Sequence, residues 1–295
     1  MASLFESAPK GLRHRVKTPD GVELEVREWG DPSGPPLLLV TGVAQSYLSF
    51  ARQYSASAFK RFRVVSYDPR GHGLSDKPLG DSWYQEGQRW SAEVQAVIDG
   101  LALERPVLAG WSLGGRIVRQ YLVDHGDAGL AGIGFISCRP VEVPEVVGSG
   151  NAVAAALDID DEASQIAVAS AFLRNCFAVP PSAEDFAFSL AFNMLCPWPI
   201  RRQIGRWLTD PEVSSRALRA IRVPTFIAHG LSDILVLAEA GKMTAELVPH
   251  AETSWYEGCG HSVFFEAPER FNREFSSFVE RAHAATPVAD RLYAP

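Results

Sequence analysis

The chain has 295 residues, of which 46% are hydrophobic and 21% are charged, and its formal net charge at pH 7 is −7. This length is enough for one large α/β domain with an insertion, or for two ordinary domains. The basic residues form no block, which argues against a nucleic-acid partner. No window approaches a membrane span, and the N-terminal segment lacks the apolar stretch of a signal peptide. We therefore expect a cytoplasmic protein that does not bind membranes.

The spacing of the cysteines argues against a structural zinc site and against disulfide bonds. They lie far apart and form no CxxC pair, a spacing that fits neither a zinc site nor a disulfide framework. Buried free thiols are the expected state. The cysteines are Cys138, Cys176, Cys196 and Cys259.

The predicted elements begin with a hairpin and continue with buried strands. Residues 14–30 alternate apolar and polar side chains around the turn signal Pro19-Asp20-Gly21, which predicts an antiparallel hairpin. Continuous apolar runs follow, each ending at glycine or a small polar residue, as is typical of parallel strands buried on both faces. These runs cover residues 35–42, 62–71, 106–112, 131–138, 223–230 and 252–260.

Helical patterns separate most of these runs. Alternation of strands and helices predicts a mostly parallel sheet with helices on both faces. The helical patterns cover residues 90–103, 115–126, 237–249 and 267–283.

One interval breaks the alternation. No strand pattern is present from about residue 139 to 210, but helical patterns occur at 161–174 and 183–195. We interpret this interval as a helical insertion that forms a cap over the ends of the strands.

A serine between small residues lies where one predicted strand meets the next helix. Gly110-Trp111-Ser112-Leu113-Gly114 matches G-x-S-x-G, the pattern of a tight strand-to-helix turn that holds its serine in a strained backbone conformation. Small neighbours are needed because larger side chains would collide with adjacent strands. The turn directs the hydroxyl outward, and the amide of Leu113 becomes a donor to a developing oxyanion. These features make Ser112 the candidate nucleophile.

A serine nucleophile needs a base that is itself held by an acid. Asp233 and His261 both follow predicted strands, at the carboxyl edge where open α/β sheets assemble their sites. The chain order serine, aspartate, histidine agrees with G-x-S-x-G hydrolases. His229 is an alternative base and Glu142 an alternative acid.

With these motifs, the sequence resembles the α/β-hydrolase superfamily, in particular its esterase, lactonase and cofactor-free haloperoxidase-like branch. The resemblance covers about residues 20–140 and 215–280. It implies an α/β-hydrolase fold: a mostly parallel eight-stranded sheet flanked by helices, with a helical cap. The expected division is core over 1–138 and 211–285, cap over 139–210 and a C-terminal tail over 286–295.

Residues 67–78 resemble the superfamily segment D-x-R-G-x-G-x-S. The resemblance implies a structural turn near the oxyanion loop, with Arg70 bonding to backbone carbonyls. We therefore expect structural rather than catalytic roles for Asp68 and His72.

The second oxyanion donor is also inferred from the resemblance. Superfamily members usually carry His-Gly after the third strand, and the next residue supplies the amide. Here the run is Thr41-Gly42-Val43, so Val43 takes that role. Thr41 departs from the pattern, but a backbone donor needs no particular side chain.

The constellation implies acyl transfer without a metal or an organic cofactor. The expected substrate is a carboxylic ester or lactone of small to medium size, with apolar or aromatic character. Serine at the turn argues against haloalkane dehalogenases and epoxide hydrolases, whose pattern has aspartate there. We expect Trp111, Phe186 and Trp198 to line the substrate pocket.

Three arginines could instead meet a substrate carboxylate. These are Arg139, Arg201 and Arg202. Solvated surface positions are the favoured interpretation, and carboxylate binding is the alternative.

Other activities are compatible with the same triad. They include carbon–carbon bond hydrolysis, hydroxynitrile lysis, perhydrolysis or haloperoxidase-like chemistry, cofactor-free oxygenation, and ligand sensing by a receptor with slow hydrolysis. A homodimer through an apolar cap surface is also compatible with the sequence.

Overall fold

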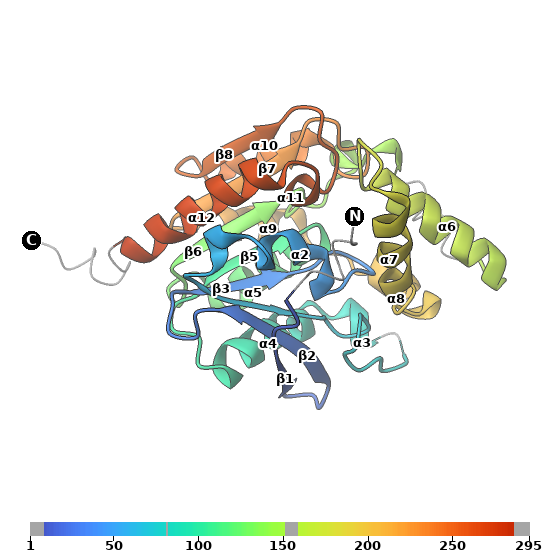
Figure 1. Cartoon of the computed structure of the whole chain (residues 1–295), viewed down its shortest axis with the longest axis horizontal. Coiled ribbons are helices and arrows are strands. Elements are labelled where there is room, and N and C mark those ends of the chain that lie inside the picture. The colour runs from blue at the N-terminus through green and yellow to red at the C-terminus, as the bar shows by residue number, and fades with distance from the viewer. Residues whose placement is uncertain (1–8, 81, 151–158, 286–295) are drawn as a thin grey trace, which may run out of the picture.

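The computed structural model of the chain describes residues 9–80, 82–150 and 159–285, and one eight-stranded sheet lies at its centre (Figure 1). The strands are β1 (Leu12–Lys17), β2 (Glu23–Gly30), β3 (Pro36–Val40), β4 (Arg63–Tyr67), β5 (Val107–Trp111), β6 (Gly132–Ile136), β7 (Thr225–Gly230) and β8 (Glu252–Tyr256). Their spatial order is β1-β2-β4-β3-β5-β6-β7-β8. The β1–β2 and β2–β4 pairs are antiparallel, whereas every pair from β4 to β8 is parallel. The predicted hairpin and mostly parallel sheet are confirmed.

Both faces of the sheet are buried, which explains the continuous apolar runs. In β3, Leu37 and Leu39 belong to one core cluster, and Leu38 and Val40 belong to the other. Successive side chains of a strand point to opposite faces. A strand between two helical layers therefore needs an apolar residue at almost every position.

Helices form the two outer layers. Helices α4, α5, α9 and α10 accompany one core cluster, and α2, α11 and α12 accompany the other (Figure 1). The α-helices are α2 (Ala51–Tyr54), α3 (Ser82–Gln85), α4 (Gly87–Gly100), α5 (Leu113–His125), α6 (Glu162–Asn175), α7 (Ala183–Asn193), α8 (Trp198–Gly205), α9 (Pro211–Arg219), α10 (Ala238–Leu247), α11 (Val263–Glu266) and α12 (Pro268–Ala284). Short 3₁₀ helices are η1 (Tyr47–Phe50), η2 (Ser57–Phe59) and η3 (Pro144–Val146).

The interval between β6 and β7 is helical in its described part. Helices α6, α7 and α8 gather at one end of the sheet, on the right in Figure 1. Helices α6 and α7 agree with the patterns at 161–174 and 183–195, whereas α8 was not predicted. Helix α8 carries Pro199 in its first turn, a position where proline is tolerated.

The division into core, cap and tail stays a prediction. Residues 151–158 of the expected cap and residues 286–295 of the expected tail lie outside the described residues.

Two strands end as many as four residues before their apolar runs do. Strand β4 ends at Tyr67 and β8 ends at Tyr256. Glycines with positive φ follow both, Gly71 at 78° and Gly258 at 69°, and turn the chain out of the sheet. The residues beyond these strand ends are therefore available to the site.

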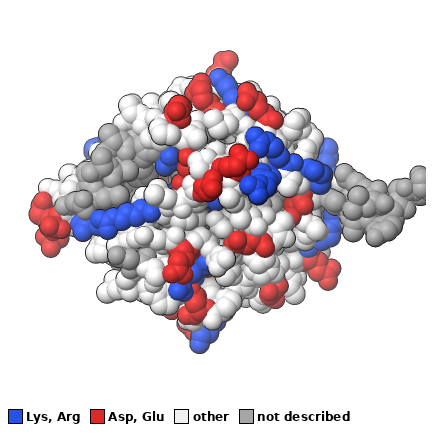
Figure 2. Space-filling model, turned by 180° about the vertical axis from the view of Figure 1, so that it is seen from behind, with Lys and Arg blue, Asp and Glu red and all other residues white. Residues whose placement is uncertain are grey.

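The surface carries both signs of charge. On the face seen in Figure 2, acidic and basic side chains are interspersed. Within the described ranges, no helix is both long and apolar enough to cross a membrane.

All four cysteines are buried and unpaired, as expected. Burial raises the pKa of the Cys138 and Cys176 thiols well above the ordinary value. Raised pKa values disfavour the reactive thiolate, so these two side chains act as small apolar core groups.

Candidate active site

Ser112 occupies a strained turn between β5 and α5. Its backbone has φ 56° and ψ −117°, a region that non-glycine residues rarely adopt. The turn is held by the amide of Ser112, which donates to the carbonyl of Ile136 at 3.1 Å, and by the amide of Gly115, which donates to the carbonyl of Ser112 at 3.0 Å. The serine therefore stands at the start of the helix with a defined orientation.

The neighbouring glycines allow close backbone approach. A Cβ atom at Gly110 would overlap the backbone of Gly114, and one at Gly114 would overlap the carbonyl of Val40. A Cβ at Gly115 would collide with the Cys138 side chain. Any side chain at these positions would displace α5 from the sheet.

Asp233 and His261 form a buried pair. Nδ1 of His261 lies 2.7 Å from Oδ2 of Asp233, and the amides of Leu235 and Val236 donate to Oδ1 at 2.8 and 3.0 Å. Burial on its own would raise the pKa of Asp233, but His261 and a hydrogen bond from His229 outweigh it and lower that pKa below the ordinary value. The carboxylate is thus held ionised beside the imidazole.

Glu142, the alternative acid, is engaged elsewhere. Its Oε1 accepts from Nε of Arg116 at 2.6 Å, from the Thr209 hydroxyl at 2.9 Å and from Arg119 at 3.3 Å. The structure brings Asp233, and not Glu142, to His261.

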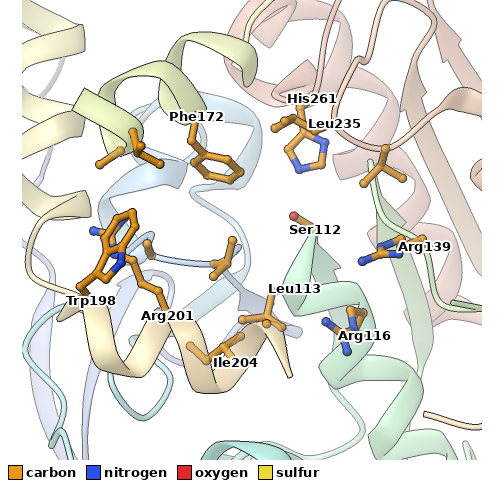
Figure 3. Close-up of a pocket in the computed structure, with 16 residues that line it drawn as sticks. Ser112, Leu113, Arg116, Arg139, Phe172, Trp198, Arg201, Ile204, Leu235 and His261 are labelled. Atoms are coloured by element: carbon orange, nitrogen blue, oxygen red, sulfur yellow. The ribbon is translucent and has the colours of Figure 1, made fainter. Parts of the chain in front are cut away.

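Ser112 and His261 line the same cavity, of about 180 Å³. In Figure 3 the imidazole of His261 lies directly above the Ser112 side chain. Most of the wall is apolar, which suits a ligand with hydrocarbon parts. The lining residues are Val43, Ala44, Ser112, Leu113, Arg116, Arg139, Val168, Ala169, Phe172, Trp198, Arg201, Ile204, Gly205, Leu235, Val236 and His261.

Of the three aromatic residues expected in the pocket, Trp198 lines the cavity, but Trp111 and Phe186 do not. The indole of Trp111 donates to the carbonyl of His261 at 2.8 Å and packs edge-on against Phe264, so it supports the histidine loop from the core. The ring of Phe186 lies under the guanidinium of Arg174, at 5.2 Å.

The two residues expected to supply oxyanion donors, Val43 and Leu113, both line the cavity. The chain after Val43 is anchored by Asp68, which accepts from the amides of Tyr47 at 2.8 Å and Leu74 at 2.9 Å. Burial raises the pKa of Asp68 to about 6. Asp68 thus has the structural surroundings expected of it, whereas the donor roles of Val43 and Leu113 stay predictions.

Arg70 has more partners than the expected carbonyls. It contacts the carbonyls of Trp83 and Arg89 at 3.4 and 3.3 Å. Its shorter contacts are to carboxylates, at 2.5 Å to Glu93 and 2.9 Å to Asp20. The buried guanidinium joins the turn to α4 and to the first hairpin.

The surface interpretation of the arginines is wrong for two of the three. Arg139 and Arg201 line the cavity, and Arg201 is only 7% exposed. Arg202 lies outside the cavity lining and contacts Asp160 at 3.4 Å. A further cavity arginine, Arg116, was missed. It lies four residues after the serine, on the same face of α5, and this spacing could have revealed it.

Glu266 connects the histidine loop to the helical interval. Its Oε2 accepts from the amide of Gly260 at 2.8 Å, next to the histidine. Its Oε1 accepts from the amides of Ala178 at 2.7 Å and Val179 at 3.1 Å, just after α6. One carboxylate therefore holds two segments far apart in the chain.

Comparison with known proteins finds relatives over nearly the whole length. A Burkholderia cenocepacia protein provisionally assigned as an aryl esterase is 34% identical, with a TM-score of 0.89 over 93% of this chain and 100% of its own. An esterase from Rhodococcus sp. ECU1013 is 26% identical, with a TM-score of 0.82 over 91% of this chain and 98% of its own. A non-heme chloroperoxidase from Streptomyces lividans is 28% identical over 281 residues, 90% of this chain and 99% of its own.

These relatives support a hydrolase activity. The family model described as the alpha/beta hydrolase fold matches residues 35–268, well over half of the chain. The fold that the resemblance implies is confirmed by this match and by the sheet order. The chain belongs to the α/β-hydrolase superfamily.

Proposed function

We propose that this protein is a serine hydrolase that cleaves a carboxylic ester or lactone of small to medium size through an acyl-enzyme. The observation that carries the proposal is the 2.7 Å contact between Asp233 and His261 at the cavity that Ser112 also lines. This arrangement has the order of groups that nucleophilic acyl transfer requires: a strained serine, an imidazole and a buried carboxylate.

In the first step, His261 takes the hydroxyl proton as Ser112 attacks the ester carbonyl. The amides of Val43 and Leu113 donate to the oxyanion, and loss of one such donor typically raises the barrier by about 3 kcal/mol. The imidazolium then gives its proton to the leaving alcohol as the bond from the carbonyl carbon to the alcohol oxygen breaks.

In the second step, water replaces the alcohol. His261 takes a proton from water as the water oxygen attacks the acyl carbon. The carboxylic acid product leaves when its bond to Ser112 breaks and the proton returns from His261 to the serine oxygen. Throughout, Asp233 accepts from Nδ1 of His261 and stabilises the imidazolium.

The test is hydrolysis of p-nitrophenyl esters from acetate to decanoate and of γ- and δ-lactones, with native protein and Ser112→Ala. We expect the variant to lose at least about a thousandfold in kcat. Ser232→Ala, at an exposed loop serine, is the matched control and should retain activity. Labelling with a fluorophosphonate should add one adduct to native protein and none to Ser112→Ala. Equal turnover by native protein and Ser112→Ala would overturn the proposal.

Perhydrolysis is a second candidate, because a relative from Acinetobacter calcoaceticus, 25% identical over 90% of this chain and 98% of its own, is a bifunctional esterase/perhydrolase. Hydrogen peroxide would attack the same acyl-enzyme in place of water and release a peracid and free Ser112. Formation of peracid from acetate and hydrogen peroxide, lost in Ser112→Ala, would establish this activity.

A further inference from the structure

The cavity wall carries positive charge without a matching carboxylate. Among the residues that the structure describes, sixteen line it, and these include three arginines but no aspartate or glutamate. A cavity that is otherwise mostly apolar gives little screening to these charges. The three arginines differ in the hydrogen bonds and ion pairs that each guanidinium already forms with other protein groups.

Two of the arginines are engaged by other groups. Arg116 donates to Glu142 and to the carbonyl of Trp207, both at 2.6 Å. Arg201 donates to the carbonyls of Cys196 at 2.9 Å and Asn193 at 2.5 Å. The donors that hold these two guanidiniums in place are therefore not available to a ligand.

Arg139 is different. Within residues 9–80, 82–150 and 159–285, no group forms a hydrogen bond or ion pair with its guanidinium. Its charged neighbours are Arg116, which repels it, and Glu142, which is already bonded to Arg116. Burial lowers the pKa of Arg139, but an arginine stays protonated at neutral pH. Arg139 is partly buried, and a partly buried cation without a protein partner gains more from a bound anion than a fully solvated one does.

The position of Arg139 relates this charge to the reaction. Arg139 lies just after β6, and in Figure 3 it stands beside Ser112, on the side opposite to Phe172 and Trp198. A ligand whose carbonyl reaches Ser112 can therefore extend its hydrocarbon part toward the aromatic side and a charged group toward Arg139.

We propose that Arg139 binds a carboxylate of the substrate, so that the preferred substrate is an ester that also carries one free carboxylate. This inference rests on the proposed ester hydrolysis. The planar guanidinium matches a carboxylate with two parallel hydrogen bonds. A single uncommitted cation matches a carboxylate monoanion better than a phosphate dianion.

The test uses pairs of esters that differ in one charge. Monophenyl adipate is compared with phenyl hexanoate for a carboxylate on the acyl side, and 4-acetoxybenzoate with methyl 4-acetoxybenzoate for one on the leaving-group side. We expect native protein to prefer the anionic ester of at least one pair in kcat/KM. Arg139→Gln should lower kcat/KM for that ester by about tenfold to a hundredfold, the range of a charge-assisted hydrogen bond, and change the neutral ester by less than about twofold.

Two controls separate charge recognition from damage to the fold. Arg219→Gln, at an exposed arginine that contacts Glu212 on α9, should leave both esters unchanged. Arg139→Gln should melt no lower than native protein, because it removes a partly buried charge without breaking a hydrogen bond. An equal loss on both esters of a pair, or no loss on either, would overturn the proposal.

A binding measurement in the Ser112→Ala variant tests the carboxylate site independently of the proposed ester hydrolysis. Monophenyl adipate and 4-acetoxybenzoate are each titrated into Ser112→Ala and into the double variant Ser112→Ala/Arg139→Gln. For the preferred ester, the Kd of the double variant should be about tenfold or more weaker than that of Ser112→Ala. If native protein cleaves no ester but this difference remains, ester hydrolysis fails and the carboxylate site stands. If esters are cleaved and both Kd values agree for both ligands, the carboxylate site fails alone.

Discussion

Nε2 of His229 lies 3.3 Å from Oδ2 of Asp233, the same oxygen that contacts Nδ1 of His261 at 2.7 Å. Nε2 of His229 also lies 2.9 Å from the carbonyl of Val236, which can only accept, so this nitrogen carries a proton. The histidine considered as an alternative base thus supports the acid from within the core.

Replacement of His229 by phenylalanine should therefore weaken the acid rather than abolish the reaction. Without this donor the pKa of Asp233 should rise, and kcat should fall by about tenfold, the value of one hydrogen bond to a charged group. The acid limb of the kcat/KM profile should move to higher pH, and His229→Gln, which keeps a donor, should restore part of the loss. An unchanged acid limb in His229→Phe would contradict this role.

Asp233 and Glu142 should respond differently to removal of their charge. Asp233→Asn should lower kcat by about ten-thousandfold, as expected when the imidazole loses its orienting acid. Glu142→Gln should keep kcat for a neutral ester within about tenfold, because its partners are Arg116, Arg119 and Thr209. Comparable losses in the two variants would return Glu142 to consideration as the acid.

His72 should control part of the acid sensitivity of the fold. Its ring is fully buried, Nδ1 contacts the carbonyl of Arg70 at 2.9 Å, and burial lowers its pKa from 6.5 to about 4. The unfolded chain therefore binds more protons between these values, so the stabilising contribution is complete above pH 6.5 and is lost as pH falls toward 4. This linkage should lower the free energy of unfolding by about 2 kcal/mol at pH 5.

His72→Phe should remove that dependence. The difference in free energy of unfolding between pH 7.5 and pH 5, measured by urea titration, should shrink by about 2 kcal/mol relative to native protein. His125→Phe, at an exposed histidine, is the control and should keep the native difference. The same slope in His72→Phe and native protein would mean that His72 does not cause it.

The serine turn should tolerate no side chain at Gly114. Because a Cβ atom there would overlap the carbonyl of Val40, Gly114→Ala should lower the free energy of unfolding by about 1 to 3 kcal/mol and reduce the proposed esterase activity. Gly129→Ala is the matched control, because nothing lies within 4 Å of its Cβ position, and its effect should stay within about 0.5 kcal/mol. Equal unfolding midpoints and equal m-values for Gly114→Ala and native protein would show that the turn accommodates the side chain without loss of stability.

The sheet could be predicted from the sequence because strands buried on both faces are continuous apolar runs. The residues that line the cavity could not be predicted in the same way. Trp111 adjoins Ser112, but its ring packs in the core cluster that also holds Ala109 and Val107, and it does not line the cavity.

The burial of the arginines depends on tertiary partners that no local pattern specifies. Arg116 is satisfied by Glu142, 26 residues away, and Arg201 by carbonyls at the end of α7. Charged side chains are usually exposed, so the surface interpretation followed the ordinary rule. The rule fails here because the fold encloses a cavity that Arg116 and Arg201 line.

The carboxylate of Glu266 has a consequence for motion. Because it holds Gly260 beside His261 and Ala178 after α6, the helical interval cannot swing away from the sheet without breaking these bonds or moving the histidine loop with it. Access to the cavity and the position of His261 are therefore mechanically linked.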